Sequence, residues 1–140
     1  MIGQFIFAGM LLIQIVSYGV AAYALFRDAT QTASRPTVPL RSWLLPALSP
    51  TRTATIAFVF WLLATIGFVA TAMSFTGTLL PEPLWQQLAI ITCLVATVGI
   101  VLFSGIWPGA PSRKLTKIDT VIALVLNAAI FVSALMGWPG

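Results

Sequence analysis

Four long stretches of the chain consist almost entirely of apolar and small residues and contain no Asp, Glu, Lys or Arg. A helix needs about 20 apolar residues to cross a hydrocarbon core roughly 30 Å thick, and each stretch meets or nearly meets that length. The stretches do not alternate apolar and polar residues as barrel strands do, and helices satisfy their own backbone hydrogen bonds in lipid. We therefore predict an all-α fold, a polytopic bundle of four transmembrane helices that forms a single domain over residues 1–140. The predicted helices are residues 2–26, 53–80, 84–107 and 120–138.

Composition indicates the same class of protein. Charged residues make up 7% of the chain, whereas a soluble domain carries about 25%. Hydrophobic residues make up 59%, and the mean hydropathy is +1.02. So few charges cannot cover a surface that faces water, which excludes a soluble enzyme, a disordered chain and a nucleic-acid-binding module. We expect no nucleic-acid partner.

The basic residues predict how the chain is oriented. All of them fall in the two connecting segments 27–52 and 108–119, whereas the turn at 81–83 holds only Glu82. The positive-inside rule then makes these two segments cytoplasmic and puts both termini on the non-cytoplasmic side. We predict a multi-pass protein of the cell membrane, with a basic face toward anionic lipid headgroups. This cytoplasmic basic face comprises Arg27, Arg35, Arg41, Arg52, Arg113, Lys114 and Lys117.

Small residues predict which helix faces pack together, because close approach of backbones drives helix association in lipid. Each predicted helix has one face of small or polar residues opposite a bulky face. In the first and second helices these faces are Gly3, Met10, Gln14, Ser17 and Ala21, and Ala57, Ala64, Gly67, Thr71 and Ser74. In the third and fourth they are Ala89, Thr92, Ala96 and Gly99, and Ala123, Asn127, Ala134 and Gly137.

The segments that flank the helices give weaker signals. The first stretch lacks a basic n-region and is too long for the apolar region of a signal peptide, so we expect a structural helix. In the first connection, the apolar run 43–48 is either a short interfacial segment or a loop under the bundle. Trp85, Trp107 and Trp138 lie at predicted helix boundaries, where indoles favour the membrane interface.

The side chains that chemistry most often requires are missing. The sequence has no His, which excludes imidazole ligation of metals or haem and His-based acid–base catalysis. One cysteine, Cys93, cannot form an intrachain disulfide or a redox pair. The three acidic residues lie outside the predicted helices, so no carboxylate is buried for proton coupling. We predict that the protein is not an enzyme and has no catalytic, metal or cofactor site.

The predicted helices still contain a few neutral polar side chains. Gln14 and Tyr18 share a face of the first helix, one turn apart, and Asn127 lies near mid-membrane in the fourth. An unpaired amide at that depth is costly, so we expect Gln14, Ser17 or Thr71 to pair with Asn127. Two interpretations stay open: a structural hydrogen bond between helices, or a polar site for a lipid-like or quinone-like ligand. The candidate intramembrane polar site is Gln14, Ser17, Tyr18, Trp61 and Asn127.

The layout of the chain from Trp61 onward resembles the DoxX-like group of bacterial four-helix membrane proteins. The resemblance rests on short segments at helix starts and turns. They are Trp61–Leu62–Leu63–Ala64 before Gly67 and Ala70, the turn Leu80–Pro81–Glu82–Pro83–Leu84–Trp85, Ile106–Trp107–Pro108, Lys117–Ile118–Asp119 and Gly137–Trp138–Pro139. This resemblance implies a bacterial membrane protein, which we expect in the inner membrane, and some members of the group accompany quinone-linked oxidoreductases.

These observations support two functional hypotheses and oppose a third. The missing catalytic side chains and the packed helix faces favour an accessory or structural subunit of a larger membrane complex, with other membrane-protein subunits as partners. The alternative is a binder or carrier of a hydrophobic small molecule, a lipid or a quinone, held by the polar site. A channel or proton-coupled transporter is disfavoured, because the predicted helices carry no charge.

Overall fold

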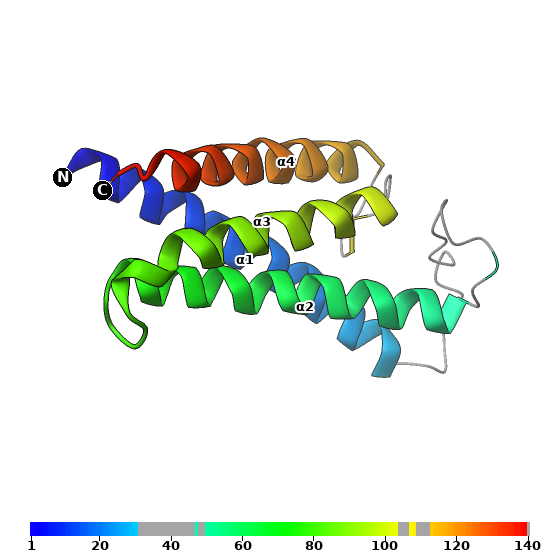
Figure 1. The fold of residues 1–140 in the computed structure, drawn as a ribbon. Helices are drawn as coiled ribbons and strands as arrows, with labels where there is room; N and C mark the ends of the chain where they lie inside the picture. Colours follow the sequence, from blue (N-terminus) through cyan, green and yellow to red (C-terminus); the bar gives the residue numbers. More distant parts are fainter. Residues whose placement is uncertain (31–46, 48–49, 104–106, 109–112, 140) are drawn as a thin grey trace.

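The computed structural model describes residues 1–30, 47, 50–103, 107–108 and 113–139. These residues form four α-helices, and a short 3-10 helix, η1 (Glu82–Leu84), precedes the third of them (Figure 1). Counting η1 with the third helix, each of the four is long and apolar enough to cross a membrane. The predicted all-helical fold with four candidate transmembrane helices is therefore confirmed for this part of the chain. The α-helices are α1 (Ile2–Thr30), α2 (Pro50–Phe75), α3 (Trp85–Leu102) and α4 (Arg113–Met136).

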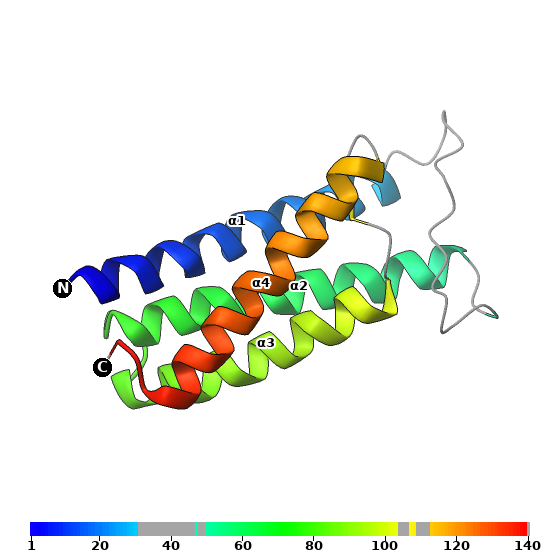
Figure 2. The same ribbon diagram turned by 90° about the horizontal axis from the view of Figure 1, so that it is seen from above.

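The four helices form a ring in which each packs on the next along the chain. α1 packs on α2, α2 on α3 and α3 on α4, and a smaller contact between α4 and α1 closes the ring. α4 crosses the bundle obliquely, from the α3 side at its C-terminal end to the α1 side at its start (Figure 2). Both termini lie at the same end of the bundle as the turn between α2 and α3 (Figure 1). We call this end the hairpin end and the opposite one the basic end.

Two glycines terminate helices at the hairpin end. Gly77 has φ +63° and Gly137 has φ +66°, a left-handed conformation that costs a residue with a Cβ about 1–2 kcal/mol. After α2, the Gly77 N–H bonds the Ser74 carbonyl at 3.1 Å and the next N–H bonds the Met73 carbonyl at 3.0 Å. The same pair of bonds follows α4. This is the Schellman arrangement, so the prediction that the second helix continues to residue 80 is wrong by five residues.

The predicted ends of the other helices also differ from the structure. α3 ends at Leu102 and not at residue 107, and α4 begins at Arg113 and not at residue 120. α1 continues to Thr30, and α2 begins at Pro50, a residue suited to a first helical turn. The absence of charge marks only the stretch that can lie in hydrocarbon, whereas a helix can continue with charged residues beyond it. The predicted connecting segments 27–52 and 108–119 are therefore partly helical.

The predicted packing faces hold for three helices and fail for the first. Most of the small residues predicted on α2, α3 and α4 are buried, among them Ala64, Ala89 and Ala123. On α1, the predicted Gly3, Met10 and Ser17 are only half-buried. Its core face instead combines large side chains with the predicted Gln14 and Ala21; the large ones are Phe7, Leu11, Tyr18 and Leu25. Large side chains of α1 therefore fill the core between this helix and the others.

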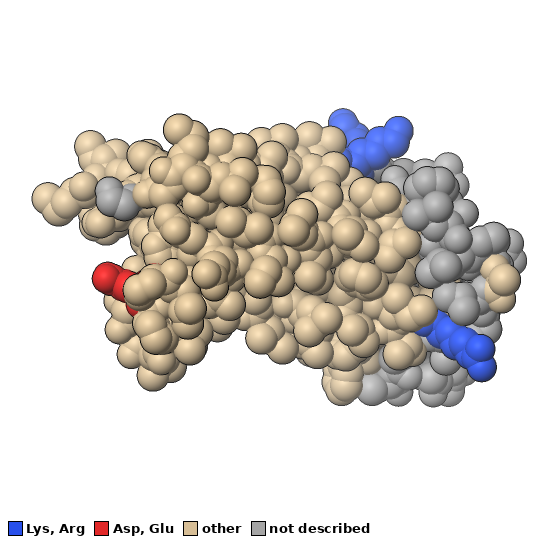
Figure 3. Space-filling model, in the orientation of Figure 1, with Lys and Arg blue, Asp and Glu red and all other residues tan. Residues whose placement is uncertain are grey.

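The described basic side chains gather at one end of the bundle. Arg27 lies in the last turn of α1, Arg52 near the start of α2, and Lys114 and Lys117 near the start of α4. In Figure 3 the visible basic side chains gather at the basic end, and the visible acidic side chain lies at the hairpin end. Of the other residues predicted for the basic face, Arg35 and Arg41 lie outside the described residues, as does most of the run 43–48. Arg113 is described only as the first residue of α4.

Candidate functional site

Three of the predicted polar residues meet in a hydrogen-bonded cluster inside the bundle. The Gln14 Nε2 group donates to Asn127 Oδ1 at 2.6 Å and to the Ala123 carbonyl at 3.1 Å. The Asn127 Nδ2 group donates to the Tyr18 hydroxyl at 3.1 Å and to Thr97 Oγ1 at 3.4 Å. The cluster thus connects α1, α3 and α4. Its members are neutral amides and hydroxyls, which orient helices but supply no charge.

The cluster is closed off from the surroundings of the protein. Gln14 is 0% exposed, Tyr18 1% and Asn127 2%. Gln14 Oε1 and Trp61 Nε1 are buried and make no hydrogen bond with the described protein. The residues that line the two cavities described below include none of these four. The cluster therefore joins helices, and it is part of neither cavity.

An aromatic group borders the cluster on its basic-end side. The Tyr18 ring stacks on Phe68, with 5.6 Å between centroids, and lies 5.6 Å from the Trp107 ring. Trp107 is also 5.8 Å from Trp61, whose other neighbour is Phe103 at 5.7 Å. Trp107 is buried inside the bundle, and its predicted depth at the membrane interface stays a prediction. Because α3 ends at Leu102, Trp107 is free of the helix and packs against α1 and α2.

The five residues of the predicted polar site thus separate into three groups. Gln14, Tyr18 and Asn127 come together, and Gln14 is the partner of Asn127 as expected. Ser17 is half-buried beside them and makes none of the hydrogen bonds described above, and the Trp61 ring contacts the Tyr18 ring through Trp107. Thr71, the third expected partner, bonds the Gly67 carbonyl within its own helix at 2.8 Å. The polar-site prediction omitted Thr97, although it lies beside the small residues of the third helix.

A cavity lies elsewhere, at the hairpin end. It has a volume of about 830 Å³ and lies between the start of α1, the end of α2, the start of α3 and Pro139. Small-molecule sites in proteins have volumes of about 300–1,000 Å³. Its polar lining residues are Gln4, Thr76, Glu82 and Gln86. Its aromatic lining residues are Phe5, Phe75 and Trp85. We call this cavity the hairpin-end pocket.

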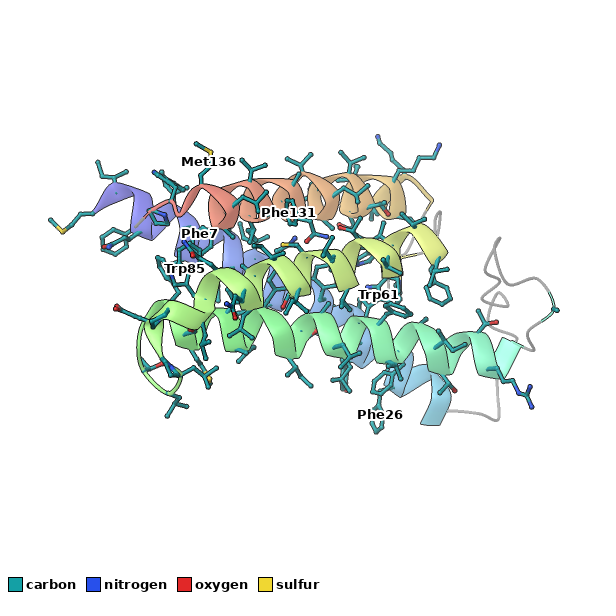
Figure 4. All side chains as sticks on the ribbon, viewed as in Figure 1. Phe7, Phe26, Trp61, Trp85, Phe131 and Met136 are labelled. Atoms are coloured by element: carbon teal, nitrogen blue, oxygen red, sulfur yellow. The ribbon has the colours of Figure 1, made fainter. Side chains whose placement is uncertain are left out.

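Aromatic packing fixes one wall of the hairpin-end pocket. The Phe7 ring lies 4.9 Å from Phe75 and 5.2 Å from Trp85, and the Phe75 and Trp85 rings are 5.4 Å apart. Phe7 is 0% exposed, so this group anchors the pocket to the core. Figure 4 shows Phe7 and Trp85 together near the hairpin end, with Trp61 far along the bundle toward the basic end. The pocket and the buried polar cluster are separate sites.

A smaller groove runs along α1 and α2. It has a volume of about 270 Å³ and is lined mainly by apolar residues, together with Tyr23 and Thr65, which carry hydroxyl groups. Gly19 helps to open it, and Phe26 and Phe58, 6.3 Å apart, lie toward the basic end. In the part of the chain that the structure describes, no three His, Cys, Asp or Glu side chains come together as metal ligands would.

Comparison with known proteins finds no matching family model, no matching curated protein and no matching solved structure. The resemblance to the DoxX-like group therefore stays a prediction. The class of protein that the fold defines is an all-helical protein with four candidate transmembrane helices.

Proposed function

We propose that this protein is a non-catalytic membrane protein that binds an amphipathic small molecule in the hairpin-end pocket. The observation that carries the proposal is the pocket itself, about 830 Å³ in volume, with polar and aromatic side chains on the same lining. Polar side chains can orient a head group, and aromatic ones can pack against the first part of an apolar tail. This proposal keeps the hypothesis of a hydrophobic ligand but assigns the ligand to the hairpin-end pocket instead of the polar cluster. In the cluster, Gln14, Tyr18 and Asn127 already form hydrogen bonds between helices.

In the proposed orientation, the pocket lies on the outer side of the cell membrane. In a bacterium, this membrane is the inner membrane. Arg27, Arg52, Lys114 and Lys117 all lie at the basic end, which the positive-inside rule assigns to the cytoplasm. The hairpin end, with both termini and the pocket, then lies at the outer interface. An amphipathic molecule concentrates at that depth, where its head meets water and its tail meets hydrocarbon.

A photoreactive alkyl alcohol added to the protein in liposomes tests this proposal. Crosslinks should map to peptides containing Phe5 and Trp85, and excess unlabelled alcohol should remove them. The variant Ala8→Trp, which places bulk in the pocket lining, should lose at least about 90% of the competed crosslinking. Ala128→Trp is the matched control, because Ala128 is exposed on α4 far from the pocket lining. Crosslinks that do not saturate, or equal labelling of both variants, would contradict ligand binding at this pocket.

The second candidate function is an accessory subunit of a larger membrane complex. The observation that favours it is α4, which has the lowest buried share of the four candidate spans and exposes Val121, Val125 and Val132. A photocrosslinking amino acid at Val125 in native membranes should give one discrete protein adduct. The matched position Val16 on α1, which is similarly exposed, should give only lipid adducts. Equal adduct patterns at both positions would contradict a partner on α4.

A further inference from the structure

The described lining of the hairpin-end pocket carries charge of one sign. Among the described residues that line it, Glu82 is the one charged side chain, and none is basic. The described Lys and Arg side chains lie at the far end of the bundle, as the visible ones in Figure 3 show. An anionic head group would therefore find no charged partner in this lining. A cationic one would find a carboxylate.

Glu82 is held in position by its neighbours along the chain. It lies between Pro81 and Pro83, which restrict the backbone on both sides. The Ser74 hydroxyl, which is fully buried, donates to the Pro81 carbonyl at 2.5 Å and ties this turn to the end of α2. Within the described residues, no ion pair engages the carboxylate of Glu82. A charged group is thus placed at the pocket by a rigid turn and left available for a ligand.

Aromatic rings share the pocket with this carboxylate. Phe5 is 74% exposed although it is a large apolar side chain, and it lines the pocket together with Phe75 and Trp85. Aromatic faces attract cations, indole most strongly, and such rings recognise quaternary ammonium groups. The side-chain amides of Gln4 and Gln86 add hydrogen-bond acceptors for the N–H groups of a primary ammonium.

We propose that the ligand of this pocket is an amphiphile with an ammonium head group, which Glu82 and the neighbouring aromatic rings bind while its apolar tail extends along the bundle into the bilayer. This inference rests on the proposed function, since it names the ligand class of the same pocket. The ammonium group is carried either by a zwitterionic bilayer lipid or by a free cationic amphiphile.

The test uses three photoreactive probes that share one alkyl tail and differ in head group: trimethylammonium, hydroxyl and phosphate. Each probe is added as a competitor, and the loss of crosslinking between the alcohol and the wild-type protein is measured in liposomes of zero net charge. We expect the trimethylammonium probe to compete at the lowest concentration and the phosphate probe at the highest. In Glu82→Gln, the apparent affinity of the trimethylammonium probe should fall roughly fivefold, the effect of losing one partly solvated ion pair. The apparent affinity of the hydroxyl probe should not change.

Asp119→Asn is the matched control, because it removes a carboxylate from the fourth helix near the basic end and should leave all three probes unchanged. The inference would be overturned if the trimethylammonium probe bound no better than the hydroxyl probe, or if Glu82→Gln did not change its binding. Either result would leave the proposed function standing. No saturable labelling by any probe would overturn both.

Native mass spectrometry separates the two sources of the ammonium group. Retention of phosphatidylethanolamine over phosphatidylglycerol by the wild-type protein, lost in Glu82→Gln, would support the inference with a bilayer lipid as ligand. Glu82-dependent probe binding without such retention would support it with a free amphiphile as ligand.

Discussion

Gln14 and Asn127, 113 positions apart in the chain, meet through a hydrogen bond of 2.6 Å from Gln14 Nε2 to Asn127 Oδ1. The bond joins α1 to α4, whose contact is the smallest of the four helix interfaces. Gln14 Nε2 also donates to the Ala123 carbonyl and Asn127 Nδ2 to the Tyr18 hydroxyl, so three hydrogen bonds fix the register of the first and last helices. A shift of α4 along α1 would leave these buried groups unpaired, which is costly in a membrane interior.

The first prediction concerns Asn127→Leu. The substitution removes three hydrogen bonds: the Tyr18 hydroxyl loses its donor, and Gln14 Nε2 keeps only its bond to the Ala123 carbonyl. We expect the free energy of unfolding to fall by about 1–3 kcal/mol, the cost of unsatisfied buried polar groups. Reversible unfolding in mixed micelles measures it.

The matched control is the double variant Gln14→Leu/Asn127→Leu. It should lose less stability than the sum of the two single variants, with a coupling of about 0.6 kcal/mol and at most roughly 1.7 kcal/mol. Strict additivity would show that the two amides do not interact in the membrane.

The second prediction concerns the contact between α2 and α3. A Cβ at Gly67 would lie 2.7 Å from Thr92 Cγ2 and 3.0 Å from Thr92 Cβ. We expect Gly67→Ala to destabilise the bundle by about 1–3 kcal/mol, a typical cost of overpacking. Gly9→Ala is the control, because a Cβ there has no neighbour within 4 Å. If both variants unfold alike, or if adding Thr92→Ala restores nothing, the close packing of these helices is refuted.

The third prediction concerns the turn beside the pocket. Gly77 has a left-handed backbone with φ +63°, so Gly77→Ala should cost about 1–2 kcal/mol of stability. Gly77→Asn should cost less, because Asn tolerates this conformation better than Ala. A Cβ at this position meets Glu82 Cγ at 3.6 Å, an ordinary contact, so the loss would come from the backbone and not from a clash. Equal stability of the wild type and Gly77→Ala would rule out the Schellman ending of α2.

The fourth prediction concerns Cys93, the single cysteine, which is 2% exposed and belongs to the core cluster. We expect a maleimide to leave it unmodified in the folded protein and to modify it fully after denaturation in dodecyl sulfate. Mass spectrometry of the intact chain measures the labelled fraction. Rapid labelling under native conditions would show that α3 does not face the core as described.

The sequence predicted those features that follow from the cost of charge in hydrocarbon. Stretches without charge located four helices, and the cost of a buried amide predicted a partner for Asn127 among Gln14, Ser17 and Thr71, of which the structure shows Gln14. The ends of the helices were not predictable this way, because charged residues remain helical beyond the hydrocarbon. Gly77 carries the signal for the end of α2, yet it lies inside an uncharged stretch, so the length of the stretch concealed it.

The pocket could not be predicted from periodicity. Phe5, Thr76, Glu82 and Pro139 come from separate parts of the chain, and only the ring of helices with its termini at one end brings them together. The core face of α1 was missed for a related reason. Small residues marked the faces of the other helices, whereas the core face of α1 also holds the large side chains Phe7, Leu11 and Tyr18.

The most direct test of the account measures on which side of the membrane each end of the bundle lies. Thr78→Cys at the hairpin end and Lys117→Cys at the basic end are introduced separately into the Cys93→Ala protein, since both positions are exposed. A membrane-impermeant maleimide is applied to intact bacterial spheroplasts and to lysed ones. The account predicts that Thr78→Cys is labelled in intact spheroplasts and Lys117→Cys only after lysis. Labelling of both variants in intact spheroplasts, or the reverse pattern, would contradict a four-helix membrane bundle with its pocket on the outer side.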